Sequence, residues 1–204
     1  MTLNNNKHFA EVIESSLQGF KAQCWQWDKP PAFGSLVTIE LSSRTLFGIV
    51  YHTQMGSMDP LRYPFPYQKT EEELMQEQPQ IFSFLKTILS CLIVGYREKG
   101  TMQYTIAPEP PKIHAFVGHA STELSKEFFS RNNYLHLIFA NQQLLTHVDE
   151  LLLAIFKQQI ALDCLSDIKL NNFIETFSLL SGNDYRRLKL FLQRAEPLIH
   201  NQNG

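Results

Sequence analysis

Apolar and polar positions alternate in short runs from Phe9 to about His119, the pattern of half-buried strands. In the segment 35–41, SLVTIEL, one face carries Val37, Ile39 and Leu41. The same criterion predicts further strands at 11–15, 22–27, 45–55, 88–98, 101–107 and 114–120. Short connections, SSR after residue 41 and Lys99-Gly100 after residue 98, are typical of hairpins. Several short strands of this kind predict a small antiparallel barrel.

One long interruption separates the strand at 45–55 from the strand at 88–98. Gly56 and the prolines that follow it are expected to end the first strand, because proline cannot donate a ladder hydrogen bond. Thr70 and Glu73 have the spacing of a capping box, which predicts a helix start. Pro79 predicts a second short helix over PQIFSFLKTIL. The barrel is therefore expected to carry a helical insertion at 70–87.

After Ala120 the pattern becomes helical. Ser121 or Thr122 is expected to cap a first helix, and Thr146 with Asp149 a long second one over 148–165. Gly182 is expected to separate two last helices, NNFIETFSLL and NDYRRLKLFLQRAEPLI. The segment 135–141 is interpreted as one more strand or a buried turn. The predicted class is α+β: a barrel over 9–120, followed by a helical region over 121–200 that packs on it.

Composition narrows the class of protein. Apolar residues make up 44% and charged residues 19% of the 204 residues, as in a folded globular chain. Three scattered cysteines and no Cys-x-x-Cys argue against a disulfide framework and fit a reducing compartment. No signal-peptide pattern is seen, and the apolar stretches fall short of the roughly 20 residues that span a bilayer. We therefore expect a soluble, cytoplasmic protein without a membrane partner.

The order of segments resembles the HAS-barrel family, the β-barrel shared by HerA-type DNA-translocating ATPases and the catalytic subunits of rotary ATP synthases. The resemblance is carried by Gly-x-Val before a polar excursion, by EQPQIF and by PPKIHAFV, and it covers roughly residues 9–120. It is closest to a stand-alone branch without the ATPase domain, and it implies a barrel that contacts other subunits or partners. No GxxxxGK[ST] loop is present, so the family's ATPase activity is not expected here.

Catalytic and metal chemistry have little support in the pattern. His114 and His119 lie five residues apart in one predicted strand and so on opposite faces, which disfavours a shared metal. Cys91 lies in the most apolar strand, where thiols are usually inert. Glu71, Glu72 and Glu73 begin a helix, where such a run is usually a solvated cap. We expect no metal, no cofactor and no catalytic residue.

Two surfaces are candidates for binding. The segment 55–67 contains Arg62, Tyr63, Phe65 and Tyr67, a composition enriched at protein interfaces. These side chains are expected either to dock a partner or to close one mouth of the barrel. The inserted helix is expected to plug or brace the barrel. The second surface is the last helix, whose basic residues are Arg186, Arg187, Lys189 and Arg194.

The expected function is a non-catalytic protein-interaction or assembly module, with a HerA-like or other oligomeric ATPase acting in trans as the candidate partner. The alternative is a nucleic-acid-associated module that uses the barrel face and the basic last helix. The net charge of −2 gives no general attraction to nucleic acid. A solvated outer face also explains the basic residues of that helix.

Overall fold

The computed structural model describes residues 7–59, 61 and 63–200. The strands within these residues run in antiparallel pairs and alternate in burial where they are half exposed, as the sequence pattern predicts. They are β1 His8–Ser15, β2 Gly19–Cys24, β3 Leu36–Glu40, β4 Arg44–Ser57, β5 Leu85–Glu98, β6 Thr101–Gln103 and β7 Phe116–His119.

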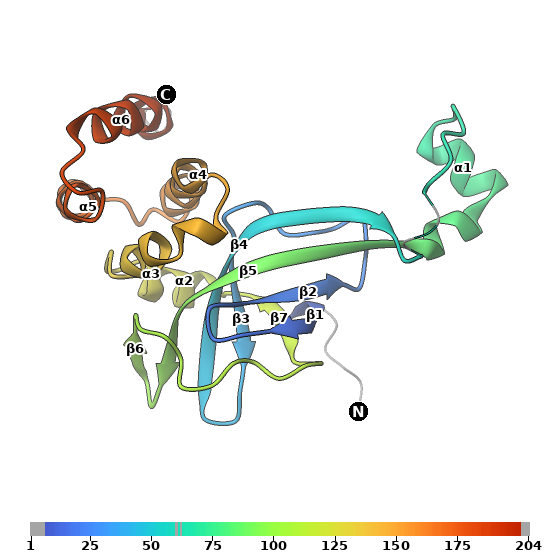
Figure 1. Cartoon of the computed structure of the whole chain (residues 1–204), viewed down its shortest axis with the longest axis horizontal. Helices are drawn as coiled ribbons and strands as arrows, with labels where there is room; N and C mark the ends of the chain where they lie inside the picture. The colour runs from blue at the N-terminus through green and yellow to red at the C-terminus, as the bar shows by residue number, and fades with distance from the viewer. Residues whose placement is uncertain (1–6, 60, 62, 201–204) are drawn as a thin grey trace.

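Six of these strands close into an antiparallel barrel (Figure 1). The sheet order is β2-β1-β7-β3-β4-β5-β6, and β2 also pairs with β5, from Gly19 opposite Leu92 to Gln23 opposite Ile88. That pairing joins the two ends of the sheet and leaves β6 outside, paired with the end of β5 alone. A Cβ at Gly19 would lie 2.4 Å from the Cys91 carbonyl oxygen, so only glycine fits where the closing strands meet.

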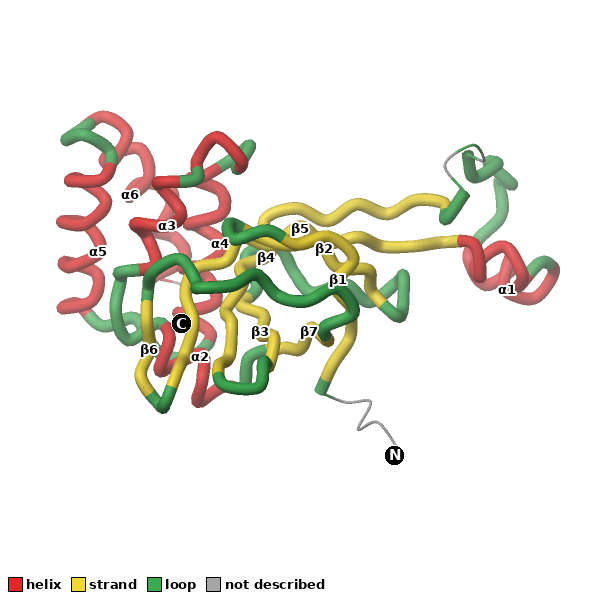
Figure 2. The backbone as a smooth tube through the Cα atoms, turned by 60° about the horizontal axis from the view of Figure 1, so that its bottom comes forward, coloured by secondary structure: helices red, strands yellow, loops and turns green. Residues whose placement is uncertain are grey.

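The helices follow in two groups. α1 Glu71–Glu77 and the 3₁₀ helix η1 Pro79–Phe84 lie between β4 and β5. The C-terminal helices gather on one side of the barrel, as Figures 1 and 2 show. They are α2 Thr122–Phe128, α3 Tyr134–Ala140, the 3₁₀ helix η2 Gln142–Leu144, α4 Val148–Ala161, α5 Asp167–Leu180 and α6 Tyr185–His200. The predicted class, a barrel with a helical insertion and a helical C-terminal region, is confirmed.

The protein has two apolar cores that share the barrel wall. One fills the barrel and includes Val12, Phe20 and Val117. The other lies between the outer face of β3–β5 and the helices, and phenylalanine and leucine are its most frequent residues. Phe47 on β4 stacks on Phe128 at the end of α2, with ring centroids 5.0 Å apart. The helical region therefore packs on the barrel through a continuous core.

Gly34 brings the barrel into direct contact with α4. Its φ of +81° lies in the left-handed region, and a Cβ there would lie 2.7 Å from the Cβ of Ala154. The Gly34 amide also donates to the Val50 carbonyl, 2.8 Å away, at the point where the chain enters β3. A side chain at this position would have to push the helix off the barrel.

Several sequence predictions are corrected by the structure. Residues 135–141 are neither a strand nor a buried turn: residues 135–140 belong to α3, and Asn141 is its C-cap. This helix is buried on most sides, so its apolar positions show no helical period. The predicted helix from Pro79 ends at Phe84, because the following residues pair with β4 as the start of β5. Thr146 does not cap α4, whose N-cap is His147 without a side-chain hydrogen bond. The capping box of Thr70 and Glu73 is confirmed.

A buried hydrogen bond inside the helical core can be tested directly. The Gln159 side-chain amide donates to the Tyr134 hydroxyl at 2.8 Å, and burial raises the pKa of that phenol. Gln159→Leu should cost about 1–3 kcal/mol in the free energy of unfolding, because a buried hydroxyl loses its partner. Tyr134→Phe should be similarly costly. The double variant should be more stable than the sum of the two losses predicts, which denaturant titration would measure; strictly additive losses would contradict this coupling.

None of the helices in the described part of the chain has the length and apolar character needed to cross a membrane.

Candidate functional site

The most prominent feature of the molecule is an arm that projects from the barrel, formed by residues 51–87 (Figures 1 and 2). β4 and β5 stay paired past Gln23, the last residue of β2 that pairs with β5, from Met55 opposite Thr87 to Ser57 opposite Leu85. The chain between them forms the tip of the arm, which carries α1 and η1. Paired strands make a stiff support, so the arm holds its tip away from the rest of the protein.

The tip of the arm encloses a hollow of about 490 Å³. Tyr63, Phe65 and Tyr67 lie in its wall opposite residues of α1, η1 and the start of β5, namely Leu74, Ile81, Phe82, Phe84 and Leu85. The Phe65 and Tyr67 rings meet edge to face with centroids 5.5 Å apart. Tyr63 is 92% exposed and Phe65 71% exposed. Three of the four residues predicted to bind a partner are therefore brought together here, and Arg62 lies outside the described residues.

Local hydrogen bonds give the tip a definite shape. The Met58 amide donates to the Phe84 carbonyl at 2.7 Å and closes the base of the loop. Asp59 accepts from the Leu61 amide at 2.9 Å, and Thr70 accepts from the Glu73 amide at 3.2 Å in the capping box. Loops ordered in this way lose less entropy when they bind than flexible ones do.

The base of the arm is attached to the barrel by residues that follow β2. The Trp27 ring stacks on Phe82 of η1, with centroids 5.7 Å apart. The Thr87 hydroxyl of β5 donates to the Trp27 carbonyl oxygen. These contacts link η1 to the barrel, while α1 has no buried residue and lies at the far end of the arm. The prediction that this helix plugs or braces the barrel is wrong, and so is the alternative that the aromatic segment closes the barrel mouth.

β4 also has an open edge along the arm. β3 pairs with β4 as far as Leu36 opposite Ile49, and hydrogen bonds to Val50 from Gly34 and Ser35 complete that contact. Beyond Val50, no strand of the described residues pairs with β4 on the side away from β5. From Tyr51 to Ser57 the strand holds no lysine, aspartate, glutamate or proline, the residues that usually protect a strand edge. This edge can accept an added strand.

The electrostatics of the arm are acidic. Its sequence contains five carboxylates, Asp59, Glu71, Glu72, Glu73 and Glu77, against three basic residues, Arg62, Lys69 and Lys86, a net charge of −2. Lys69 is ion-paired with Glu77, which leaves the first turn of α1 as an exposed acidic rim beside the aromatic hollow. A surface that complements the tip is therefore apolar with a basic margin.

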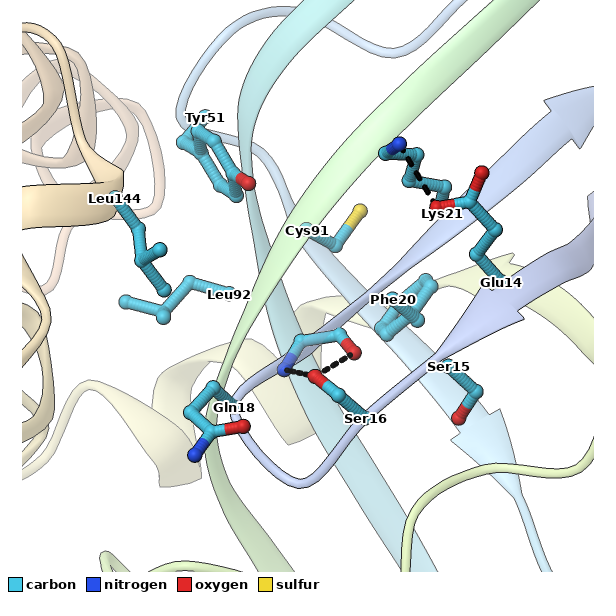
Figure 3. A pocket seen from close by; sticks show the side chains of 11 residues that line it. Glu14, Ser15, Ser16, Gln18, Phe20, Lys21, Tyr51, Cys91, Leu92 and Leu144 are labelled. Carbon is cyan, nitrogen blue, oxygen red and sulfur yellow. Dashed lines mark hydrogen bonds and ion pairs between the residues drawn. The ribbon is translucent and has the colours of Figure 1, made fainter.

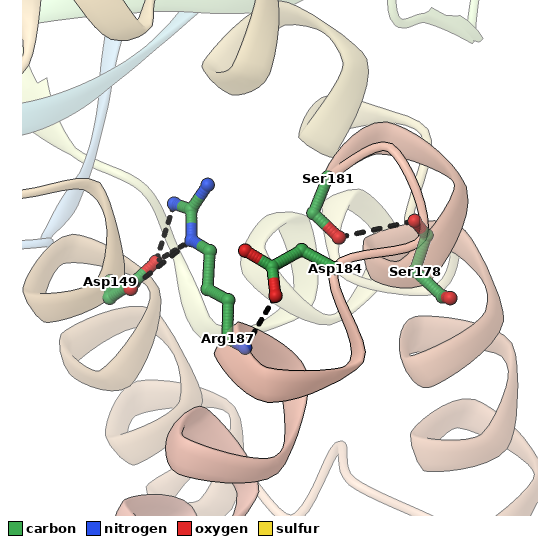
Figure 4. A network of polar contacts seen from close by, with 5 residues as sticks. All are labelled: Asp149, Ser178, Ser181, Asp184 and Arg187. Atoms are coloured by element: carbon green, nitrogen blue, oxygen red, sulfur yellow. Dashed lines mark hydrogen bonds and ion pairs between the residues drawn. The ribbon is translucent and has the colours of Figure 1, made fainter.

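The basic residues of α6 are partly neutralised within the protein. Figure 4 shows the Arg187 guanidinium against Asp149, to which Nη2 donates at 2.7 Å and Nε at 3.1 Å. The guanidinium also lies over the Phe139 ring, 5.4 Å from its centroid. Arg194 donates to Glu150 at 2.6 Å. Arg186 and Lys189 are exposed, and neither forms an ion pair with a carboxylate of the described residues. Two of the four predicted cations are therefore open to a ligand.

The histidines do not gather. His114 precedes β7 rather than lying within it, with a φ of +69° and its ring beside Glu11. His119 ends β7, its ring centroid is 4.4 Å from that of Phe9, and burial lowers its pKa. Among the described residues, no three histidine, cysteine, aspartate or glutamate side chains lie close enough to hold a metal ion together.

A smaller hollow of about 230 Å³ lies beside Cys91 and the turn between β1 and β2 (Figure 3). Its polar groups are engaged with one another: Lys21 pairs with Glu14 at 2.8 Å, and Ser16 and Gly19 share two hydrogen bonds. The Cys91 sulfur in its wall is buried, and burial raises the pKa of this thiol. This arrangement gives no activated nucleophile.

We expect the thiols of the barrel to react slowly with iodoacetamide in the native state. Burial raises the pKa of Cys24 to about 11, so its thiolate fraction is small at neutral pH and grows only as the pH approaches that value. Cys91 should stay protected even at alkaline pH for as long as the barrel stays folded. Mass spectrometry of the alkylated protein, with a urea-unfolded control, measures both rates; fast labelling of native Cys91 at pH 7 would contradict its placement.

The sequence is matched by no model of a known protein family, and a search of curated proteins finds none similar to it. The evidence about function therefore comes from the geometry described above.

Sequence reasoning missed part of the exposed apolar surface of the arm. The pattern places Phe84 in a second short helix and predicts nothing about its exposure; Phe84 is 58% exposed, and Met75 of α1 is 49% exposed. Their exposure depends on the distance of the tip from the barrel, which no local pattern reveals.

Proposed function

We propose that the protein is a non-catalytic interaction module whose arm docks a protein partner. One observation carries this proposal: a stiff, two-stranded arm holds an ordered and highly exposed aromatic hollow away from the barrel. An exposed cluster of large apolar side chains lowers the solubility of a protein and commonly marks a binding site. Aromatic and methionine side chains are the types enriched at interfaces. The open edge of β4 offers backbone hydrogen bonds to the same partner.

The partner that fits is an apolar surface with basic residues at its margin. Phe65, Tyr63 and the half-buried Tyr67 supply rigid rings, and the exposed glutamates of α1 supply the charge. We propose an oligomeric ATPase of the HerA type, acting in trans, as this partner. The support for that identity is the resemblance of residues 9–120 to the HAS-barrel family together with a barrel that has no phosphate-binding loop of its own.

Affinity purification of the tagged full-length chain from its own cells tests the proposal. The extract is divided and treated with or without nuclease, and the recovered proteins are quantified by mass spectrometry. We expect a stoichiometric ATPase in both samples. Recovery restricted to nucleic-acid-binding proteins that disappear after nuclease treatment would reject this function and favour the nucleic-acid alternative.

A further inference from the structure

Another hollow lies on the barrel itself, lined by residues of β1, of β7 and of the chain that follows β2. The strand order brings three segments together there: because β1 runs antiparallel to both β2 and β7, the start of β1 lies beside the ends of the other two. His8 is opposite Gly118, and the Trp25 amide donates to the Phe9 carbonyl at 2.9 Å. The hollow between these segments measures about 660 Å³, within the usual range for small-ligand sites.

The lining of this hollow is basic and aromatic. It consists of Lys7, His8, Phe9, Trp25, Gln26, Lys29 and His119. Among the described residues that form the wall there are two lysines and no carboxylate, and Asp28, next to Lys29 in the chain, is not one of them. A further hollow lies between α6 and the chain from η2 to the start of α4, and there Asp149 and Glu150 neutralise Arg187 and Arg194. An anion is therefore favoured in the hollow on the barrel and disfavoured in the one at α6.

The aromatic part of the wall is held in place by neighbouring rings. Trp25 meets Phe116 edge to face with centroids 5.4 Å apart, and Phe9 lies against His119. Trp25 is nevertheless 42% exposed, which is high for a residue braced in this way. Gly118 allows the backbone of Lys7 to lie against β7, since a Cβ there would be 2.6 Å from the Lys7 carbonyl oxygen. The indole is thus positioned by the barrel, and the backbone of Lys7 is held against β7.

We propose that this hollow binds a nucleotide unit, either free or within a single strand, with its base against Trp25 and its phosphate near Lys7 and Lys29. A flat ring with an open face and nearby cations is the combination by which proteins bind unpaired nucleotides. A base in a duplex could not reach the indole, so double-stranded nucleic acid is disfavoured. This binding is independent of the arm.

The chain contains two tryptophans, and Trp27→Phe leaves Trp25 as the only one, so its fluorescence reports the site. In this background, the protein is titrated at low salt with thymidine monophosphate and with a short oligothymidylate. We expect the oligonucleotide to quench the fluorescence of Trp25. The mononucleotide, which offers a single phosphate, should bind more weakly. Contact with two phosphates predicts a slope of about −1.4 for log K against log salt concentration. Quenching by the oligonucleotide alone would assign the site to strands, and quenching by both with similar affinity would assign it to free nucleotides.

The charge reversal Lys7→Glu/Lys29→Glu should weaken binding at least about tenfold and abolish most of the salt dependence. Arg186→Glu/Lys189→Glu on α6, a matched reversal of two exposed cations, should leave the affinity unchanged. Both variants alter exposed side chains, and circular dichroism verifies that they fold. No quenching by either ligand, or a loss confined to the α6 variant, would overturn the proposal. The arm variant Tyr63→Ser/Phe65→Ser/Tyr67→Ser should bind normally, so failure of the arm function and failure of this site are distinguishable.

Discussion

Replacement of Phe128 by alanine will lower the free energy of unfolding by about 3–5 kcal/mol. The Phe128 side chain is fully buried and contacts both halves of the protein: Phe47 of the barrel on one side, Phe129 and Tyr134 of the helical region on the other. The alanine variant leaves a cavity at this junction, which the surrounding strands and helices cannot fill without moving. Urea titration with linear extrapolation measures the loss.

Phe84→Ala is the matched control, because it removes the same ring from the exposed surface of the arm. Its effect on the free energy of unfolding should stay within about 0.5 kcal/mol. A loss below about 1 kcal/mol for Phe128→Ala would mean that the helical region does not depend on the barrel, contrary to the shared core described above.

The second large effect concerns binding. Tyr63→Ser/Phe65→Ser/Tyr67→Ser should reduce affinity for the purified partner at least about a hundredfold, because buried aromatic anchors commonly contribute 2 kcal/mol or more each. Stability should change little, since these side chains line the hollow at the tip and contribute nothing to the two cores. Isothermal titration calorimetry measures the affinity, and the urea midpoint verifies the fold.

A charge-matched control is available on α1. Glu71→Gln/Glu72→Gln removes exposed carboxylates beside the hollow but keeps the rings and the capping box of Thr70 and Glu73. It should slow association and reduce the salt dependence of binding with a smaller effect on affinity. Unchanged affinity of the serine variant in a folded protein would show that the aromatic tip is not the contact surface.

Much of the fold follows from local pattern. The alternation in SLVTIEL and its neighbours predicts the strands, and Thr70 and Glu73 predict where α1 begins. The closure of the barrel cannot be predicted from local pattern. It depends on the pairing of β2 with β5, which joins segments about 70 residues apart that no turn connects. The prediction for the segment LHLIFAN was wrong because its apolar residues lie on several sides of the helix α3.

The candidate sites were predicted in part. The composition of residues 55–67 predicts an interface segment, yet the place of this segment on an arm depends on the non-local pairing of Gly56 with Lys86. Arg187 looks like a free cation in the sequence, and only the fold places Asp149 beside it. The hollow at Trp25 was not predicted at all, because Lys7, Lys29 and His119 converge only once the strand order is known.

The central claim, that the arm is the docking surface, is tested most directly by hydrogen–deuterium exchange of the full chain with and without the recovered partner. The account predicts slower exchange on binding in residues 51–87, including the amides on the open edge of β4, and little change in α6. Protection confined to α6 or to the barrel, with an unchanged arm, would contradict it.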